Sequence, residues 1–511
     1  MALARSLAVT LTGVRASVVE VEADLSQGLP TMSFTGLADT SVVESRDRVR
    51  AAVQNSGMSW PNRRITVALL PADVRKSGSR FDLAIAVAVL ACDEQRVRPE
   101  AVRDAAWIAE LGLDGKLRPV RGVLPAVAAA RDAGVRRVVV SAANGAEAAL
   151  VPDVDVRVAD QLADVVGWLD GSGEPLGTPS PALLIADEVP GPDLADVAGQ
   201  ELAKRAVEIA AAGGHHMYLE GVPGAGKTML AERLPGLLPP LDDAASLEVT
   251  AVHSVAGLLG PRARLIRQAP LQAPHHTASV ASLVGGGSHL ARPGAISLAH
   301  HGVLFLDEAP EFASNALDAL RQPLESGMVV LHRGGGVVSY PARFQLVLAA
   351  NPCPCANATG ECECAPWARR RYQQRLSGPL LDRIDLRVHV EAVAHAALVD
   401  LSGDRETTAV VAARVAAARI AAAERWAGTA WRCNADVPGS ALRALPWALP
   451  HVALAPAEGY LQRGQLSARG FDRVLRLAWT IADLAGRAVP DSSDIAEALF
   501  FRTGRTEGWA A

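Results

Sequence analysis

The amino-acid sequence predicts an α/β protein built from three consecutive parts. A glycine-rich loop at 221–228 lies between an apolar strand and a helix, which is the setting of a phosphate-binding loop. Two further apolar strands, at 302–306 and 344–350, end directly in polar residues. The region that follows is alanine-rich and helical in pattern. These features predict a phosphate-binding α/β core, preceded by an α+β domain and followed by a helical domain.

The chain of 511 residues is too long for a single hydrophobic core. The first domain is expected to span residues 1–170, where short strands alternate with helices. A linker rich in Gly, Pro and Ser is expected over 171–192. The core is then predicted over 193–394 and the helical domain over 395–511.

Composition excludes several classes of protein. No run of about 18 uncharged apolar residues occurs, so we predict no membrane-spanning segment. The first residues lack the charged start and the unbroken apolar stretch of a signal peptide, so a cytoplasmic protein is expected. The net charge of −5 and the pI near 6.2 argue against a broadly basic surface. Any contact with nucleic acid should therefore be local.

The first domain shows secondary-structure signals without a catalytic motif. Ser41 and Glu44 have the spacing of a capping box, which predicts a helix starting there. An apolar strand is expected over 64–70 and an apolar helix over 81–91. The Asp-Gly pair at 114–115 predicts the turn of a hairpin.

The phosphate-binding loop is the most informative feature of the sequence. It consists of Gly221, Val222, Pro223, Gly224, Ala225, Gly226, Lys227 and Thr228. Backbone N–H groups of such a loop, and the N-terminus of the helix that follows, surround a phosphate. Lys227 is expected to reach the β- and γ-phosphates, and Thr228 to offer its hydroxyl to Mg²⁺. The sequence therefore predicts ATP and Mg²⁺ as cofactors, on a helix expected to stop at Pro235.

An apolar strand at 302–306 ends in two carboxylates about eighty residues after the loop. Asp307 is placed to hold Mg²⁺ through water, and Glu308 to orient and deprotonate the attacking water. Taken alone, the pair could be a solvated strand end. Together with the phosphate-binding loop, it predicts nucleotide hydrolysis.

Asn351 directly follows the buried strand at 344–350. Its amide could bind the γ-phosphate or the attacking water. The alternative is a turn-forming Asn before Pro352, and the residues alone leave both interpretations open.

Four cysteines crowd into twelve residues: Cys353, Cys355, Cys362 and Cys364. Four thiolates could bind one tetrahedral Zn²⁺ with a structural role. Free or redox-active thiols are the alternative, because the C-x-C spacing is less common than C-x₂-C.

Three adjacent histidine pairs occur at 215–216, 275–276 and 300–301. Neighbouring residues of a strand point to opposite faces, so a pair placed on a strand cannot easily share one ion. Packing or substrate contact is the favoured interpretation.

The order of these motifs resembles that of the AAA+ ATPases. The amino-acid sequences of the motifs resemble those of the magnesium-chelatase-like family known as YifB or ComM. The segments that carry the resemblance are 33–37, 75–82, 273–279, 285–287, 292–302, 351–355 and 376–385. The resemblance covers nearly the whole chain. It implies a P-loop AAA+ ATPase core with a C-terminal helical lid, which hydrolyses ATP to ADP and phosphate.

The resemblance also implies roles for two arginines and for Asn351. Arg383 matches the arginine finger, which reaches into the nucleotide site of a neighbouring subunit. Arg469 matches the sensor 2 position of the lid, and Asn351 the sensor 1 position. An arginine finger implies a ring, and the family implies a homo-hexamer.

The first domain resembles the Lon-protease-like fold, also called ribosomal S5 domain 2-like, most clearly over 110–120. The serine nucleophile of a Lon-type site aligns with Arg80 and its lysine base with Leu124. Neither residue can perform that chemistry, so we expect no protease. The domain is instead expected to bind a partner, a substrate or DNA.

The family resemblance implies a ring motor that acts on branched or single-stranded DNA, as a helicase in branch migration. Two segments could supply contacts to DNA: 252–279, with Arg262, Arg264 and Arg267, and a hairpin at 328–340, with His332 and Arg333 before its glycine tip. An ordinary surface hairpin is the alternative. The competing function is a chelatase-like ATPase that remodels a protein partner.

Overall fold

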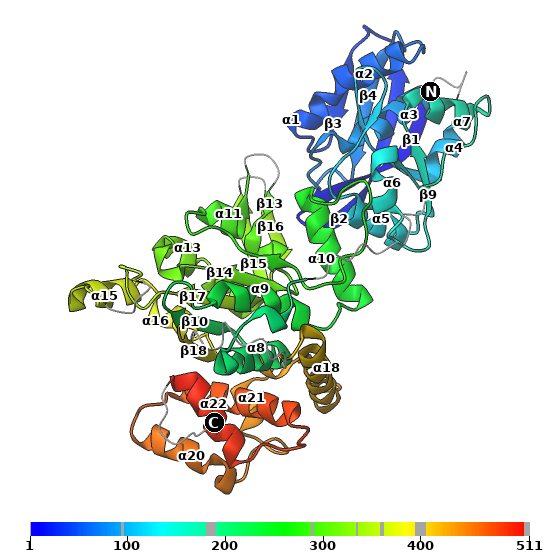
Figure 1. Cartoon of the computed structure of the whole chain (residues 1–511). Coiled ribbons are helices and arrows are strands. Elements are labelled where there is room, and N and C mark those ends of the chain that lie inside the picture. The colour runs from blue at the N-terminus through cyan, green and yellow to red at the C-terminus, as the bar shows by residue number, and fades with distance from the viewer. Residues whose placement is uncertain are drawn as a thin grey trace.

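The computed structural model describes residues 2–92, 97–179, 191–287, 291–333, 336–357, 362–393 and 405–504. Three parts follow one another along the molecule (Figure 1): an N-terminal α+β domain, a central α/β core and a C-terminal group of helices. The predicted fold class is thus confirmed. Half of the expected linker, at 180–190, and the expected boundary between 394 and 395 lie outside the described residues.

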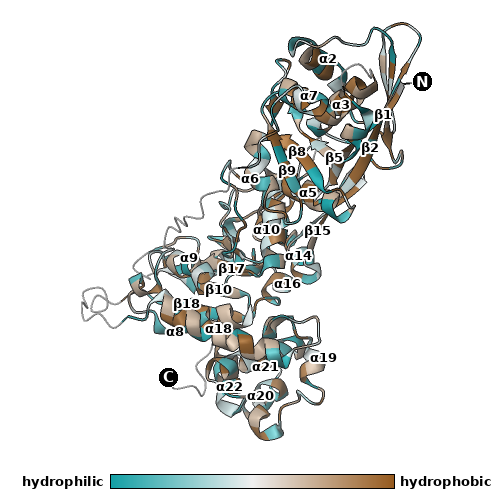
Figure 2. Ribbon diagram, turned by 90° about the vertical axis from the view of Figure 1, so that its right-hand side faces the viewer, coloured by the Kyte–Doolittle hydropathy of each residue, from teal (hydrophilic) through white to brown (hydrophobic). Residues whose placement is uncertain are grey.

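The N-terminal domain is a seven-stranded mixed sheet in the order β3-β4-β2-β1-β5-β8-β9. Its strands are β1 (Ala2–Thr12), β2 (Arg15–Ser26), β3 (Met32–Thr35), β4 (Arg64–Leu70), β5 (Ala105–Ile108), β8 (Arg137–Ser141) and β9 (Asp155–Ala159). The short pair β6 (Glu110–Leu111) and β7 (Leu117–Arg118) flanks the Asp-Gly turn. Its helices are α1 (Thr40–Val43), α2 (Ser45–Asn55), α3 (Asp82–Cys92), α4 (Pro99–Arg103), α5 (Val123–Asp132), α6 (Gly145–Ala148) and α7 (Leu162–Asp170). Every residue of α3 is buried, and both α3 and β8 are coloured as hydrophobic in Figure 2.

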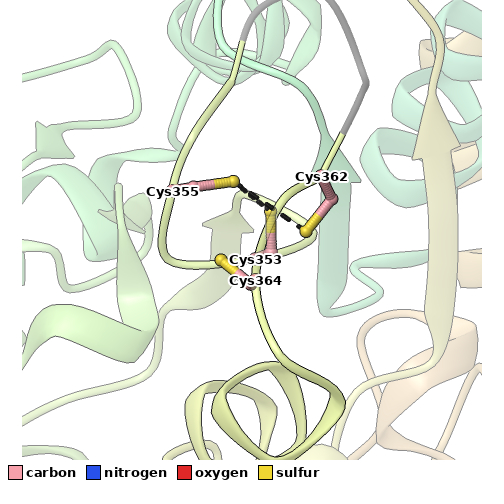
Figure 3. Close-up of side chains that lie close together, drawn as sticks. All are labelled: Cys353, Cys355, Cys362 and Cys364. Carbon is pink, nitrogen blue, oxygen red and sulfur yellow. Dashed lines mark hydrogen bonds between the residues drawn. The ribbon is translucent and has the colours of Figure 1, made fainter.

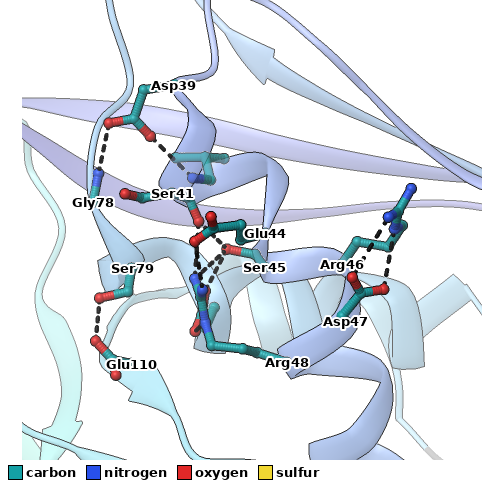
Figure 4. Close-up of polar contacts among 12 residues, drawn as sticks. Asp39, Ser41, Glu44, Ser45, Arg46, Asp47, Arg48, Gly78, Ser79 and Glu110 are labelled. Atoms are coloured by element: carbon teal, nitrogen blue, oxygen red, sulfur yellow. Dashed lines mark hydrogen bonds and ion pairs between the residues drawn. The ribbon is translucent and has the colours of Figure 1, made fainter.

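The predicted capping box at Ser41 is wrong. Asp39 is the N-cap, and its carboxylate accepts a hydrogen bond from the Val42 N–H at 3.0 Å (Figure 4). The helix then breaks at Glu44, and α2 continues beyond it. Asp39 also accepts from the Gly78 N–H, 39 residues away, so a tertiary contact selects the cap.

The central core is a five-stranded parallel sheet in the order β11-β14-β17-β10-β18. These strands are β11 (Leu271–Gln272), β14 (Val303–Leu306), β17 (Gln345–Ala350), β10 (Met217–Gly221) and β18 (Leu386–Val390). Strands β14 and β17 are buried throughout, because helices cover both faces of a parallel sheet. The helices of the core are α8 (Glu201–Gly213), α9 (Lys227–Leu237), α10 (Asp243–Ala256), α11 (Val280–Val284), α12 (Ala295–Leu298), α13 (Ser314–Asp318), α14 (Arg321–Ser326), α15 (Pro366–Gln373) and α16 (Gly378–Leu381).

Helix α9 continues past Pro235, where it was expected to stop, and ends at Leu237. The proline lies in the last turn, where its missing N–H costs a single helical hydrogen bond. Its carbonyl still accepts from the Leu238 N–H at 3.2 Å.

The C-terminal part consists of α18 (Thr408–Arg425), α19 (Gly439–Leu442), α20 (His451–Gln462), α21 (Ala468–Leu484) and α22 (Ser492–Thr503). Trp426 lies at its centre and contacts Trp431, Trp447 and Trp479 at ring-centroid distances of 5.6, 4.8 and 6.2 Å. One apolar cluster runs from these helices into the face of the parallel sheet formed by β10, β17 and β18. No helix within the described ranges is long and apolar enough to cross a bilayer.

Within the described residues, the N-terminal domain meets the core at two places. Helix α10 packs on α5, and the Gly122 N–H donates to the Ser254 carbonyl at 3.1 Å. At the second contact, Gly13 (φ +67°) lies against the hairpin of β15 (Met328–Arg333) and β16 (Gly336–Pro341). A Cβ at Gly13 would lie only 2.7 Å from the Ser339 carbonyl oxygen, so this close approach requires glycine.

Candidate functional site

The predicted phosphate-binding loop connects β10 to α9, at the carboxyl end of the parallel sheet. Gly224 and Gly226 have φ values of +77° and +94°, which glycine adopts without strain. At Gly221 a side chain would collide with the Val390 carbonyl oxygen of the neighbouring strand β18. Gln200, which the sequence did not single out, donates from Nε2 to the carbonyl oxygens of Ala225 and Glu391. The loop is therefore supported from two sides.

Lys227 begins α9 and lies at the centre of the site. Its Nζ donates to the carbonyl oxygens of Gly221 at 2.7 Å and Val222 at 2.9 Å, and to Asn351 Oδ1 at 3.1 Å. Burial lowers the pKa of the ammonium, and the nearby carboxylates Asp307 and Glu308 oppose that shift. The ammonium is thus held among acceptors that a phosphate could replace.

Thr228 and Asp307 meet across the sheet although 79 residues separate them. The hydroxyl of Thr228 donates to Asp307 Oδ2 at 2.8 Å. A hydroxyl and a carboxylate at the edge of a phosphate-binding loop are oxygen donors of the kind that Mg²⁺ prefers. The donor set fits Mg²⁺ bound together with a nucleotide.

Glu308 has a left-handed backbone conformation, with φ of 49°. Few residues other than glycine adopt this conformation, and such strain clusters at functional sites. Its Oε2 lies 3.0 Å from Nδ1 of His276. The sequence offered no signal for this pair, because 32 residues separate the two positions.

Asn351 directly follows β17, which pairs with both β10 and β14. Besides accepting from Lys227, it donates its backbone N–H to the hydroxyl of Tyr372, a buried residue of α15. Burial raises the pKa of Tyr372 to about 12, so its hydroxyl stays protonated. The structure therefore brings Lys227, Thr228, Asp307, Glu308 and Asn351 to one edge of the sheet.

Arg383 and Arg469 lie elsewhere. Arg383 precedes β18, whose first residue pairs with the first residue of β10, so it lies at the amino edge of the sheet. Five residues of strand, or roughly 13 Å, separate this edge from the phosphate-binding loop. Arg383 pairs with Glu325, and burial together with Arg321, Arg469 and Arg473 lowers its pKa.

Arg469, at the start of α21, lies beside Arg383 rather than over the phosphate-binding loop. Its Nη1 is 3.3 Å from Asp382, the residue that precedes Arg383. Its side chain is 81% exposed. The two arginines thus share one surface, away from the loop of their own chain.

Three family models together match most of the chain. "Magnesium chelatase, subunit ChlI" matches residues 193–398, "Subunit ChlI of Mg-chelatase" matches 21–144, and "Magnesium chelatase, subunit ChlI C-terminal" matches 405–502. An uncharacterized protein of Mycobacterium tuberculosis is 53% identical over 505 residues, which are 98% of this chain and 99% of that protein.

Relatives from Haemophilus and Escherichia decide the family. Competence protein ComM of Haemophilus influenzae is 41% identical over 497 residues, 96% of this chain and 95% of the relative. The uncharacterized protein YifB of Escherichia coli is 41% identical over 491 residues, with the same coverage. The chain belongs to the YifB/ComM family of magnesium-chelatase-like AAA+ proteins. The family expected from the motifs is thereby confirmed, and with it an ATPase of the AAA+ class.

The four cysteines of this YifB/ComM member come together directly after Asn351 (Figure 3). All four sulfur atoms lie within 4.8 Å of one another, and the distances from Cys355 Sγ to Cys353 and Cys362 Sγ are 3.1 and 3.9 Å. Tetrahedral Zn²⁺ with Zn–S bonds of about 2.3 Å holds its sulfurs roughly 3.8 Å apart. The thiols therefore fit a closed zinc site. Residues 358–361, within the loop, lie outside the described residues.

A second cluster of residues that commonly bind metals consists of Glu248, His300 and His301. This cluster does not fit a metal site. His300 Nδ1 accepts from the Arg343 backbone N–H at 3.0 Å, so Nε2 carries the proton. That nitrogen lies 3.0 Å from the Glu248 carboxylate, to which it donates. Burial lowers the pKa of His300 to about 4, so the ring stays neutral. The two histidines follow α12 in a turn rather than a strand. The opposite orientation of neighbouring residues in a strand therefore does not separate these two side chains.

The positions aligned with a Lon-type catalytic pair hold no catalytic groups in this YifB/ComM chain. Arg80 is buried and, with Glu147 as the nearest opposite charge, has its pKa lowered by burial to about 10. Glu147 accepts from the Leu124 N–H at 2.9 Å and from the Ser254 hydroxyl of α10. Ser79, which precedes the aligned position, donates its hydroxyl to Glu110 (Figure 4). Among these residues, Glu147 contributes to the contact with the core, through Ser254.

The segments proposed to contact DNA are only partly described. Strands β15 and β16 form the expected hairpin, with His332 exposed near its end. The side chain of Arg333 and residues 334–335 lie outside the described part of the chain. Arg267 is paired with Asp243 at 2.9 Å, whereas Arg262 is exposed.

We predict that His276→Ala raises ATP hydrolysis measured without any partner. In the structure Nδ1 of His276 lies 3.0 Å from the Glu308 carboxylate, which we expect to bind the attacking water. Removing a hydrogen bond of about 1 kcal/mol should release the base and increase turnover about fivefold. Turnover is measured as phosphate release, with His275→Ala as the matched control, because His275 contacts Thr277 and the His276 ring but does not pair with Glu308. An unchanged or lower rate for His276→Ala would contradict the prediction.

Proposed function

We propose that this protein is an ATP-hydrolysing ring motor that acts on DNA in the cytoplasm. The observation that carries the proposal is the separation of the catalytic groups on two edges of one sheet. Lys227, Asp307 and Asn351 lie at the carboxyl edge, whereas Arg383 lies at the amino edge. One chain therefore supplies half of each of two nucleotide sites.

At the carboxyl edge, Lys227 binds the β- and γ-phosphates, and Thr228 with Asp307 orients Mg²⁺. When held there by Thr228 and Asp307, Mg²⁺ would supply positive charge that neutralises the phosphates. Once His276 releases it, Glu308 accepts a proton from the attacking water. Asn351 positions that water or the γ-phosphate with its amide.

At the amino edge, Arg383 and Arg469 of a neighbouring subunit stabilise the charge that develops on the γ-phosphate. A head-to-tail contact of this kind closes into a ring when the rotation between subunits allows it. We propose the hexamer that the family implies. The lid carries Arg469, so lid movement would couple hydrolysis to motion of the ring.

DNA is the proposed substrate because the Haemophilus relative is named as a competence protein. The β15–β16 hairpin, which extends from the core, is the proposed contact with the DNA backbone. Branch migration of recombination intermediates is the activity that the family resemblance implies. The N-terminal domain is the proposed contact for a protein partner.

The second candidate is a chelatase-like ATPase that remodels a protein. It is favoured by the family models and by 27% identity over 161 residues to the magnesium-chelatase 67 kDa subunit of Chlorobaculum tepidum. That match covers 31% of this chain and 23% of the relative.

We also propose a structural Zn²⁺ bound by Cys353, Cys355, Cys362 and Cys364. All four ligands are thiols, so the site would have no open position for catalysis. The ion would fix the loop between Asn351 and α15. Free thiols are the alternative outcome of the test.

The proposed function predicts that forked or four-way DNA binds the protein and stimulates ATP hydrolysis. Lys227→Ala should abolish nucleotide binding, whereas Glu308→Gln should bind ATP and hydrolyse it at least about 100-fold more slowly, because the base is lost. Arg333→Ala should weaken the response to DNA. If DNA neither binds nor stimulates, and Arg333→Ala has no effect, the DNA assignment fails while the ATPase assignment stands.

A shared site predicts recovery of activity when two inactive variants are mixed. Arg383→Ala keeps its own phosphate-binding loop, and Glu308→Gln keeps its arginines. In randomly mixed rings, about a quarter of the sites combine the intact halves. ATP turnover of the mixture should exceed that of either variant alone. A mixture of Glu308→Gln with a double variant carrying both changes is the control. Failure of the first mixture to recover, although the subunits exchange, would place Arg383 outside the neighbouring site.

The zinc proposal predicts about one Zn²⁺ per chain in protein purified without a histidine tag. Cys355→Ser and Cys362→Ser should each lower the zinc content measured by elemental analysis. Cys433→Ser is the matched control, because Cys433 lies outside the cluster. Metal-free wild-type protein with four titratable thiols would refute the site.

A further inference from the structure

Helix α15 directly follows the cysteine cluster and projects from the side of the core (Figure 1). Its sequence is Pro-Trp-Ala-Arg-Arg-Arg-Tyr-Gln. Trp367 is 68% exposed, and the three arginines Arg369, Arg370 and Arg371 are exposed as well. None of these arginines forms an ion pair with any residue that the structure describes. A large aromatic ring and three cations are thus presented together to solvent.

The helical period separates the residues of α15 into two faces. Trp367, Arg370 and Arg371 are related by i, i+3 and i+4 spacing, so they share one face. Ala368 and Tyr372 define another face, where Tyr372 is buried. The arginines beside Trp367 are therefore not needed to hold the helix in place, because the other face already anchors it.

The anchored face leads directly to the catalytic groups. Tyr372 accepts a hydrogen bond from the Asn351 backbone N–H. Arg375, two residues after the helix, donates to Glu311 at 2.7 Å and to the Pro310 carbonyl at 3.1 Å. Pro310 and Glu311 belong to the turn that begins at Glu308. A ligand on α15 would thus lie one layer of side chains away from Asn351 and Glu308.

The composition of the exposed face fits a nucleic-acid strand better than a protein surface. A stable protein interface has an apolar centre, whereas this face has Trp367 as its single apolar side chain. Residues 365–378 contain four arginines and no carboxylate, although the whole chain has a net charge of −5. Arginines bind phosphates, and an exposed tryptophan stacks on unpaired bases.

We propose that Trp367, Arg370 and Arg371 of α15 form a binding site for single-stranded DNA. The arginines bind consecutive phosphates, and the indole ring stacks on a base between them. Through Tyr372 and Arg375, the bound strand biases the positions of Asn351 and Glu308 and so increases ATP turnover. The inference rests on the proposed function and assigns it a contact surface apart from the β15–β16 hairpin.

The test measures binding of a fluorescently labelled poly-dT strand of about 30 nucleotides to the full chain by anisotropy, at several salt concentrations. Arg370→Glu/Arg371→Glu should weaken binding at least about tenfold and reduce the slope of log Kd against log salt by about 1.4, or about 0.7 for each phosphate that is no longer bound. Trp367→Ala should weaken binding about tenfold without changing that slope. Arg370→Lys/Arg371→Lys should keep the slope, because it keeps both charges.

Arg46→Glu/Arg50→Glu on helix α2 is the matched control, since it changes the same charge on an exposed helix of the N-terminal domain. ATP hydrolysis without DNA and the mass of the ATP-bound assembly should be unchanged in all variants. If the α15 variants bind the strand as tightly as the wild type does, this inference is overturned and the proposed function stands. Absence of wild-type binding would overturn both. Loss of assembly instead of DNA binding would overturn it too, by showing that α15 contacts a neighbouring subunit.

Discussion

Parallel pairing of the adjacent strands β14, β17, β10 and β18 is the constraint on which the candidate site depends. In a parallel sheet, strands that are distant in sequence deliver their following residues to the same edge. The phosphate-binding loop, the acidic strand end and Asn351 come from three separate segments, yet Lys227 touches Asn351 and Thr228 touches Asp307. The same pairing sends the residues that precede β18 to the opposite edge, so it also keeps Arg383 away. A single geometric rule thus gathers the residues around the phosphate-binding loop and separates Arg383 from them.

Features encoded within one segment could be predicted from the sequence. The loop at 221–228 carries its own glycine and lysine chemistry, and the strands at 302–306 and 344–350 are recognisable by their uninterrupted apolar residues. The family could be predicted because its motifs are long and specific. Local rules failed where a distant residue intervened: Asp39 rather than Ser41 caps α1, because Gly78 also needs the Asp39 carboxylate.

Contacts between distant segments could not be predicted. No local pattern connects His276 with Glu308, Arg469 with Asp382, or Tyr372 with Asn351. Each pair depends on how the chain returns to the sheet after a loop. The pairing of Glu248 with His300 shows the same limit, because the turn that follows α12 places the ring where a strand would not.

The Gly13 contact has a mechanical consequence. A domain tethered only by its linker could tumble independently of the core, but here a backbone turn of the N-terminal domain rests on β16 while α5 rests on α10. With two separate contacts, the N-terminal domain cannot rotate about a single point of contact with the core. A displacement of the β15–β16 hairpin would therefore carry the N-terminal sheet with it.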